Sequence, residues 1–184
     1  MKTILILRHA KSDWSNLGQT DFERLLAKRG LEDAPRMGKV LALFDCVPDR
    51  IIASPARRAR QTAEIVAKTC GYQDTIQWEE VIYGGDHVDL ITLLQQLPSR
   101  IERPLLVGHN PTLETTVAAL CASYNQGRGD DQSEAWTIKI PTAGLVCLKV
   151  DLTNWATLAP GQGVLHWFLI PKLVKAIQLS DAEG

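Results

Sequence analysis

The sequence has few of the features that would set it apart from an ordinary globular domain. Its 184 residues include only four cysteines and 6% aromatic residues, and the formal net charge is -1. No stretch approaches the roughly 18 apolar residues of a membrane span. Because the charges are nearly balanced, the protein has no overall positive field to attract nucleic acid or an acidic membrane. Any bound anion must therefore be held by local contacts at one site.

The cysteines are too scattered for a metal site or a disulfide framework. They are Cys46, Cys70, Cys121 and Cys147, with no C-x-x-C pair among them. We expect reduced thiols that pack as small hydrophobes. The apolar stretch after Lys2 is cut off by Arg8 before it reaches the ~7 to 15 residues of a signal-peptide core. These observations predict a cytoplasmic protein with neither metal nor other cofactor.

The length predicts one domain over residues 1–184. A chain of this size buries about 70% of the surface that its unfolded form exposes, so it needs no disulfide or metal to be stable. Within the domain we place the catalytic motifs in 3–120, a polar loop at 123–133, C-terminal strands in 134–170 and a tail at 171–184.

Hydrophobic patterns predict alternating strands and helices. Continuous apolar runs predict strands at Thr3–Leu7, Arg50–Ala53 and Pro104–Gly108. Apolar residues at helical spacing follow each run, as in Met37–Phe44. Further strands are predicted at Trp136–Ile140, Leu145–Val150 and Val164–Ile170, the later ones as antiparallel additions at an edge. The alternation predicts an α/β fold, a three-layer α/β/α sandwich with a mostly parallel central sheet.

Three helix starts are marked by capping residues. Ser54-Pro55 and Asn110-Pro111 each combine a cap residue with a proline, which suits the first helical position. Asp86 is the predicted cap of a third helix.

Three strand ends carry the residues that suggest chemistry. They are Arg8-His9, Ser54–Arg58 and Gly108-His109-Asn110. Ligands of open α/β sheets bind beyond the carboxyl ends of the strands, and two of these segments are also predicted helix N-termini, which favour anions. A pocket with two histidines and arginine suits phosphoryl transfer, because the transferring group spreads negative charge over three oxygens.

These segments resemble the motifs of the histidine phosphatase superfamily, which has the phosphoglycerate mutase-like fold. Leu7–Ser12 reads L-R-H-A-K-S and resembles the family's Arg-His signature. Ser54–Thr62 is similar to its S-P-x-x-R-A-x-Q-T element, and Val107–Pro111 is similar to its G-H-N segment. The following Asp21–Arg24 is most similar to the SixA-like phosphohistidine phosphatase branch, although Leu25 stands where that branch usually has proline.

The resemblance implies a role for each central residue. His9 is expected to be the nucleophile, which forms a covalent phosphohistidine and so splits one displacement into two easier ones. Arg8 and Arg58 are expected to clamp the phosphoryl oxygens, and His109 to donate to one of them. Glu80 lies in a segment like the family's E-x-x-Y-G and is the candidate general acid, with a plain surface glutamate as the alternative.

Five further residues are weaker candidates for the phosphate or substrate site, because each could equally have an ordinary role, such as a solvated loop residue or a helix cap. They are Arg24, Lys11, Asn110, Ser12 and His87. Trp14 is close enough to the signature to wall the entrance.

The leading hypothesis is a metal-independent hydrolase, a phosphatase that acts on phosphohistidine of a signalling or phosphotransfer protein. The short loops before Ser54 and between Tyr83 and Leu90 predict an open pocket that suits a protein-borne phosphate, whose imidazole leaving group depends less on an acid. The alternatives are a small-molecule phosphomonoesterase or mutase of the same superfamily, and a phosphate-binding module without turnover. A nucleotide-binding Rossmann domain is disfavoured, because no G-x-G-x-x-G follows the first strand. The sequence leaves the oligomeric state open.

Overall fold

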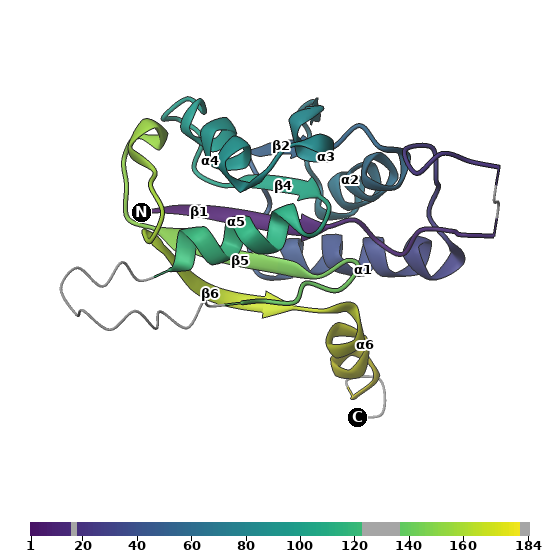
Figure 1. Cartoon of the computed structure of the whole chain (residues 1–184). Helices are drawn as coiled ribbons and strands as arrows, with labels where there is room; N and C mark the ends of the chain where they lie inside the picture. The colour runs from purple at the N-terminus through teal and green to yellow at the C-terminus, as the bar shows by residue number, and fades with distance from the viewer. Residues whose placement is uncertain (16–17, 123–136, 181–184) are drawn as a thin grey trace.

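The computed structural model describes residues 1–15, 18–122 and 137–180, and its central feature is a six-stranded sheet (Figure 1). The strands lie in the order β3-β2-β4-β1-β5-β6. Their bounds are β1 Lys2–Arg8, β2 Arg50–Ala53, β3 Gln77–Trp78, β4 Pro104–Gly108, β5 Leu145–Val150 and β6 Gly163–Leu169. β3, β2, β4 and β1 pair in parallel, whereas β5 and β6 are antiparallel additions. This arrangement confirms the predicted mostly parallel sheet and its antiparallel edge.

Helices cover both faces of the sheet. Their bounds are α1 Lys28–Leu43, α2 Arg57–Cys70, α3 Val81–Gly84, α4 His87–Gln95, α5 Thr112–Cys121, the 3-10 turn η1 Trp155–Thr157 and α6 Pro171–Ser180. Alternate residues of β1 point to opposite sides, so Ile4 and Ile6 pack into the core with α4 and α5, and Leu5 and Leu7 into the core with α1 and α2. The three-layer prediction is confirmed.

The strand register brings three chemically important chain segments to one edge. Arg8 at the end of β1 pairs with Gly108 at the end of β4. The ladder continues one residue further, because the His9 amide donates to the Gly108 carbonyl at 3.0 Å. On the other side of β4, the Ser54 amide donates to the Val107 carbonyl at 2.9 Å. The residues that follow β1, β2 and β4 therefore lie side by side.

Two helices start later than their sequences predict. The predicted cap Ser54 still belongs to the strand ladder and its hydroxyl contacts His109, so α2 begins at Arg57 with Ala56 as N-cap. Asn110 is not a cap either, because its side-chain amide donates to Glu114 and to the Ile140 carbonyl, and α5 begins at Thr112. Tertiary contacts of the two polar side chains override their local capping preference. The predicted cap Asp86 is confirmed for α4, where it forms a capping box.

The C-terminal part differs from the prediction in two places. Residues 137–140 are not a strand, since the Ile140 amide donates to Glu114 and its carbonyl accepts from Arg8 and Asn110 instead of joining a ladder. The predicted loop 123–133 and Trp136 lie outside the described residues. The start of the predicted tail is the helix α6, which buries Val174 against the α1 side of the core. The extent of the domain stays a prediction.

All four cysteines are free thiols, as the sequence predicts, with Cys70 and Cys147 buried and the other two half-buried. Burial raises the pKa of Cys147 to about 11. Of the helices in the described ranges, none combines the length and the apolar character needed to cross a bilayer.

Candidate active site

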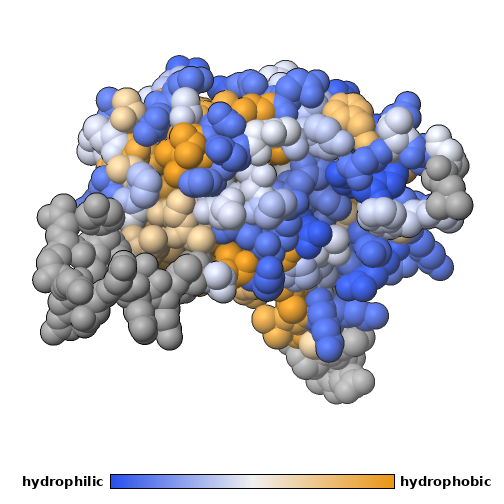
Figure 2. All heavy atoms as spheres, in the orientation of Figure 1, coloured by the Kyte–Doolittle hydropathy of each residue, from blue (hydrophilic) through white to orange (hydrophobic). Residues whose placement is uncertain are grey.

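A cavity of about 440 Å³ opens at the carboxyl ends of β1 and β4. In Figure 2, which has the orientation of Figure 1, hydrophilic residues dominate the right-hand part of the molecule, where β1 and β4 end. The lining residues are Arg8, His9, Lys11, Ser12, Trp14, Asp21, Arg24, Arg58, Tyr83, His109, Asn110 and Thr142. Four of them are permanent or near-permanent cations and one is a carboxylate, so the cavity suits an anion.

His9 is held as a neutral imidazole. Its ring is buried, and Nδ1 lies 2.8 Å from the carbonyl oxygen of Ala10. A carbonyl oxygen only accepts, so Nδ1 carries the proton and Nε2 keeps its lone pair. Burial, reinforced by nearby arginines, lowers the pKa of His9 to about 3. The Ala10 peptide is itself fixed by a hydrogen bond from its amide to the Thr62 hydroxyl at 3.0 Å.

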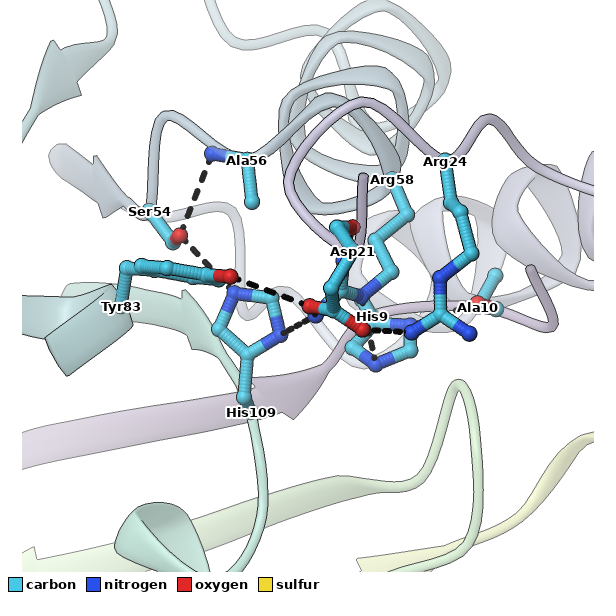
Figure 3. A network of polar contacts seen from close by, with 9 residues as sticks. All are labelled: His9, Ala10, Asp21, Arg24, Ser54, Ala56, Arg58, Tyr83 and His109. Atoms are coloured by element: carbon cyan, nitrogen blue, oxygen red, sulfur yellow. Dashed lines mark hydrogen bonds and ion pairs between the residues drawn. The ribbon is translucent and has the colours of Figure 1, made fainter. Parts of the chain in front are cut away.

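Arg58, near the start of α2, connects the two histidines (Figure 3). Its Nε donates to His9 Nε2 at 3.3 Å, and its Nη2 donates to His109 Nδ1 at 3.2 Å. The other hydrogen bonds of its guanidinium group are with Asp21, whose carboxylate accepts from Nη2 at 2.8 Å and whose backbone carbonyl accepts from Nη1 at 2.5 Å. Arg57, one position earlier, is exposed. Arg58 is therefore the arginine of this pair that the fold places in the pocket.

His109 is neutral too, with the opposite tautomer. Since Arg58 can only donate to Nδ1, the ring proton lies on Nε2, which donates to Ser54 Oγ at 2.8 Å. Burial first, and then the positive charges around it, lower the pKa of His109 to about 2. In this state His109 has no N–H for a phosphoryl oxygen. Ser54 can either accept from Nε2 or donate to it, so it accommodates both tautomers.

Two arginines of the lining keep unpaired donors. Arg8 donates from Nη1 to the Ile140 carbonyl at 2.8 Å, and Arg24 stacks on the Trp14 ring with 3.5 Å between its Cζ and the ring centroid. Within the described part of the chain, Nε of each arginine is buried without a hydrogen-bond partner. Buried donors without partners are costly, so these N–H groups are suited to engage an anionic ligand.

Eight of the ten predicted site residues line the cavity. The exceptions are Glu80 and His87. Glu80 precedes α3 with an exposed side chain, and His87 begins α4 half-buried. Neither belongs to the lining, so the structure does not bring the candidate general acid to the other four central residues.

Sequence reasoning missed three polar residues of the cavity, Asp21, Tyr83 and Thr142. Tyr83 packs edge-on against the His109 ring with centroids 5.4 Å apart, and its hydroxyl donates to Asp21 at 3.1 Å. Gly108 permits this packing, since a Cβ there would lie 2.6 Å from Ile82, the neighbour of Tyr83. Asp21 and Tyr83 lie in the segments that contain Arg24 and Glu80, whereas Thr142 lies in none of the motifs.

The arrangement places an unprotonated ring nitrogen within an anion-binding pocket. Such a nitrogen can attack an electrophilic phosphorus, and the guanidinium groups can stabilise the oxygens around it. No three His, Cys, Asp or Glu side chains in the described ranges are grouped so that they could hold a metal ion.

Comparisons with known proteins point the same way. The family model of the histidine phosphatase superfamily (branch 1) matches residues 4–87. An uncharacterized protein of Mycobacterium tuberculosis is 32% identical over 166 residues, which cover 90% of this chain and 100% of that protein. A crystal structure of a protein assigned as the phosphohistidine phosphatase SixA of Agrobacterium tumefaciens is 28% identical, with a TM-score of 0.73 over 92% of this chain and 98% of the other. A structure of the protein histidine phosphatase SixA complexed with tungstate is 21% identical, with a TM-score of 0.76 over 94% and 99%, and shares the fold.

Proposed function

The chain belongs to the histidine phosphatase superfamily, on its SixA-like branch, and is a phosphatase; from this premise we propose that it hydrolyses phosphohistidine on a protein through a covalent phosphohistidine on His9. The observation that carries the proposal is the state of His9. Its Nε2 is unprotonated, its Nδ1 proton is tied to the Ala10 carbonyl, and three arginines line the same cavity. A neutral nucleophile is thus available at neutral pH without a separate base.

The reaction proceeds in two displacements. In the first, His9 Nε2 forms a bond to phosphorus while the bond from phosphorus to the substrate nitrogen breaks, and the leaving imidazole takes up a proton from solvent. In the second, the oxygen of a water molecule forms a bond to phosphorus while the bond from His9 Nε2 to phosphorus breaks. The water gives a proton back to solvent, inorganic phosphate leaves, and His9 returns to its neutral form. Arg8 and Arg58 stabilise the charge on the phosphoryl oxygens in both steps. His109 donates to the same oxygens when it adopts its other tautomer, in which Nδ1 carries the proton and Nε2 accepts from the Ser54 hydroxyl.

The leaving group favours phosphohistidine over an alkyl phosphate. An alkoxide needs an acid to protonate it, whereas an imidazole is expelled more easily. Glu80 lies outside the lining, so the acid predicted for esters is not part of this proposal and its role stays a prediction. Among the described lining residues the one carboxylate, Asp21, is tied to two arginines.

The accessibility of the cavity favours a phosphate presented by a protein. Trp14 at its margin is 65% exposed, and Asp21 and Tyr83 are exposed as well. On the Tyr83 side of the cavity, only residues 82–86 lie between the first residues of α3 and α4, so the chain there is short. A phosphohistidine on a signalling or phosphotransfer protein can reach such a site directly, and we propose that class of partner.

The test is a substrate panel measured by kcat/KM. We expect a protein carrying phosphohistidine to be turned over about 100-fold more efficiently than small sugar phosphates, since only the former combines a good leaving group with contacts to the rim. The exposed Arg57→Ala variant is the matched control for Arg58→Ala, and it should retain the wild-type preference. Sugar phosphates turned over more efficiently than the phosphoprotein would refute the substrate assignment.

A further inference from the structure

A carboxylate occupies the middle of the cationic pocket. Asp21 Oδ2 accepts from Arg58 Nη2 at 2.8 Å and from the Tyr83 hydroxyl at 3.1 Å, and Oδ1 is ion-paired with Arg24. Figure 3 shows the Asp21 carboxylate between Tyr83 and Arg24, beside both histidine rings. Two guanidinium groups and a hydroxyl around one anion form the kind of site that also binds a phosphoryl group.

A reactive phosphoryl group has to lie beside the same guanidinium group that holds the carboxylate. For attack, phosphorus has to come within about 3 to 3.5 Å of His9 Nε2. That nitrogen lies 3.3 Å from Arg58 Nε, on the same guanidinium whose Nη2 contacts Asp21. Two anions on one guanidinium repel each other, so the phosphoryl group and the carboxylate exclude one another.

We propose that Asp21 is a specificity-determining residue: its carboxylate is an internal ligand of the phosphate subsite, and a phosphoryl group binds by exchanging with it at Arg24 and Arg58. The inference rests on the proposed function, because it takes the site to be a phosphate site. A phosphoryl dianion has more charge and more terminal oxygens than a carboxylate and can replace it. Acetate carries no more charge and no more oxygens than the tethered Asp21 carboxylate, and chloride carries no oxygen, so neither replaces it. After hydrolysis the returning carboxylate helps to release inorganic phosphate.

The loop is built so that the side chain can move while the backbone stays. The Asp21 carbonyl accepts from Arg58 Nη1, and the next carbonyl, of Phe22, accepts from the Arg57 amide at 2.9 Å. The Asp21 side chain is 49% exposed, so the displaced carboxylate can turn towards water. Exchange therefore needs a side-chain rotation alone.

The arginines have supports that do not depend on the carboxylate. Arg58 also contacts both histidines and the Asp21 carbonyl, and Arg24 stacks on Trp14. Removing the charge of Asp21 should therefore leave both guanidinium groups in place and free to bind another anion.

The experiment measures dissociation constants of inorganic phosphate and acetate by calorimetry, in wild type, Asp21→Asn and Glu23→Gln. Glu23 is exposed in the same loop, so its variant makes the same charge change outside the cavity. We expect Asp21→Asn to bind phosphate about tenfold or more tightly than wild type and to gain measurable acetate binding, with Glu23→Gln within about twofold of wild type. Asp21→Ser is a second variant in case the amide perturbs folding, and it should behave in the same way.

Phosphate binding that is unchanged or weaker in both Asp21 variants would overturn the exchange. This outcome is distinct from failure of the proposed function, since phosphate affinity is measured without any substrate. Tighter phosphate binding in the variants, with no turnover of phosphohistidine protein by wild type, would support the exchange at Asp21 and remove the assigned substrate. If wild type and all variants bind no phosphate, both proposals fail.

Discussion

Strand β1 carries a buried or half-buried cation at each end, and the two differ in how completely their donors are used. At the amino end, Lys2 is 2% exposed and donates to the Ser99 and Ile101 carbonyls and to Glu102, all within 2.8 Å. At the carboxyl end, the Arg8 side chain makes one hydrogen bond, and its buried Nε has no partner in the described structure. The fully paired Lys2 contributes to stability, whereas Arg8, which lines the cavity with an unused donor, is suited to bind a ligand.

The largest effect should follow from changing Arg58, the cation that connects the carboxyl-end residues. Arg58→Lys keeps the charge but loses the planar fork that reaches both histidines and Asp21. We expect kcat/KM to fall about 100-fold or more, with little change in Tm. Arg57→Lys on the exposed neighbouring position is the control, and equal losses in the two variants would contradict the assignment.

Only part of this site can be predicted from the sequence. The strand ends and three of the motifs were readable, because apolar runs and short loops fix where β1, β2 and β4 end. Asp21 was not, because it reaches the cavity from a loop through its contacts with Arg58, a residue 37 positions away. The local pattern predicts a helix cap at Ser54, because its hydrogen bond to His109 is a tertiary contact that no local pattern encodes.

The pH dependence of stability should separate the neutral histidines of the site from exposed ones. The pKa of His9 is lowered to about 3, so the unfolded chain binds more protons below its ordinary pKa near 6.5. The stabilisation is fully present above pH 6.5 and is lost as the pH falls towards 3. For each such histidine, acidification from pH 6.5 to pH 5 should lower the free energy of unfolding by roughly 2 kcal/mol.

Chemical denaturation of His9→Gln at both pH values measures this contribution. The variant should lose less stability on acidification than wild type, whereas His166→Gln, at an exposed position of β6, should match wild type. Identical losses in all three proteins would show that His9 is not held neutral by the fold.

At the amino end of β1, the opposite pattern is expected. Lys2→Met leaves the Ser99 carbonyl without its donor, while the Ile101 carbonyl still accepts from Trp155 Nε1. We expect a loss of about 1 to 2 kcal/mol in the free energy of unfolding and an unchanged kcat/KM. A loss of activity without a loss of stability would break the contrast between the two strand ends.

The smallest effect is predicted for Ser54, which acts through His109. Ser54→Ala removes the partner of Nε2, so kcat should fall about three- to tenfold and the acidic limb of the pH–rate profile should shift. Ser54→Thr keeps a hydroxyl and should restore both. A shift in Tm with an unchanged pH profile would instead assign Ser54 a purely structural role.

The central claim is that His9 Nε2 becomes covalently phosphorylated during turnover. The direct measurement is to mix the protein with a phosphoramidate or an aryl phosphate, quench rapidly and locate the phosphoryl group by mass spectrometry. We expect an acid-labile, base-stable phosphoryl group on His9 that is missing in His9→Ala. Turnover without any phosphorylated His9, or with the group on another residue, would contradict it.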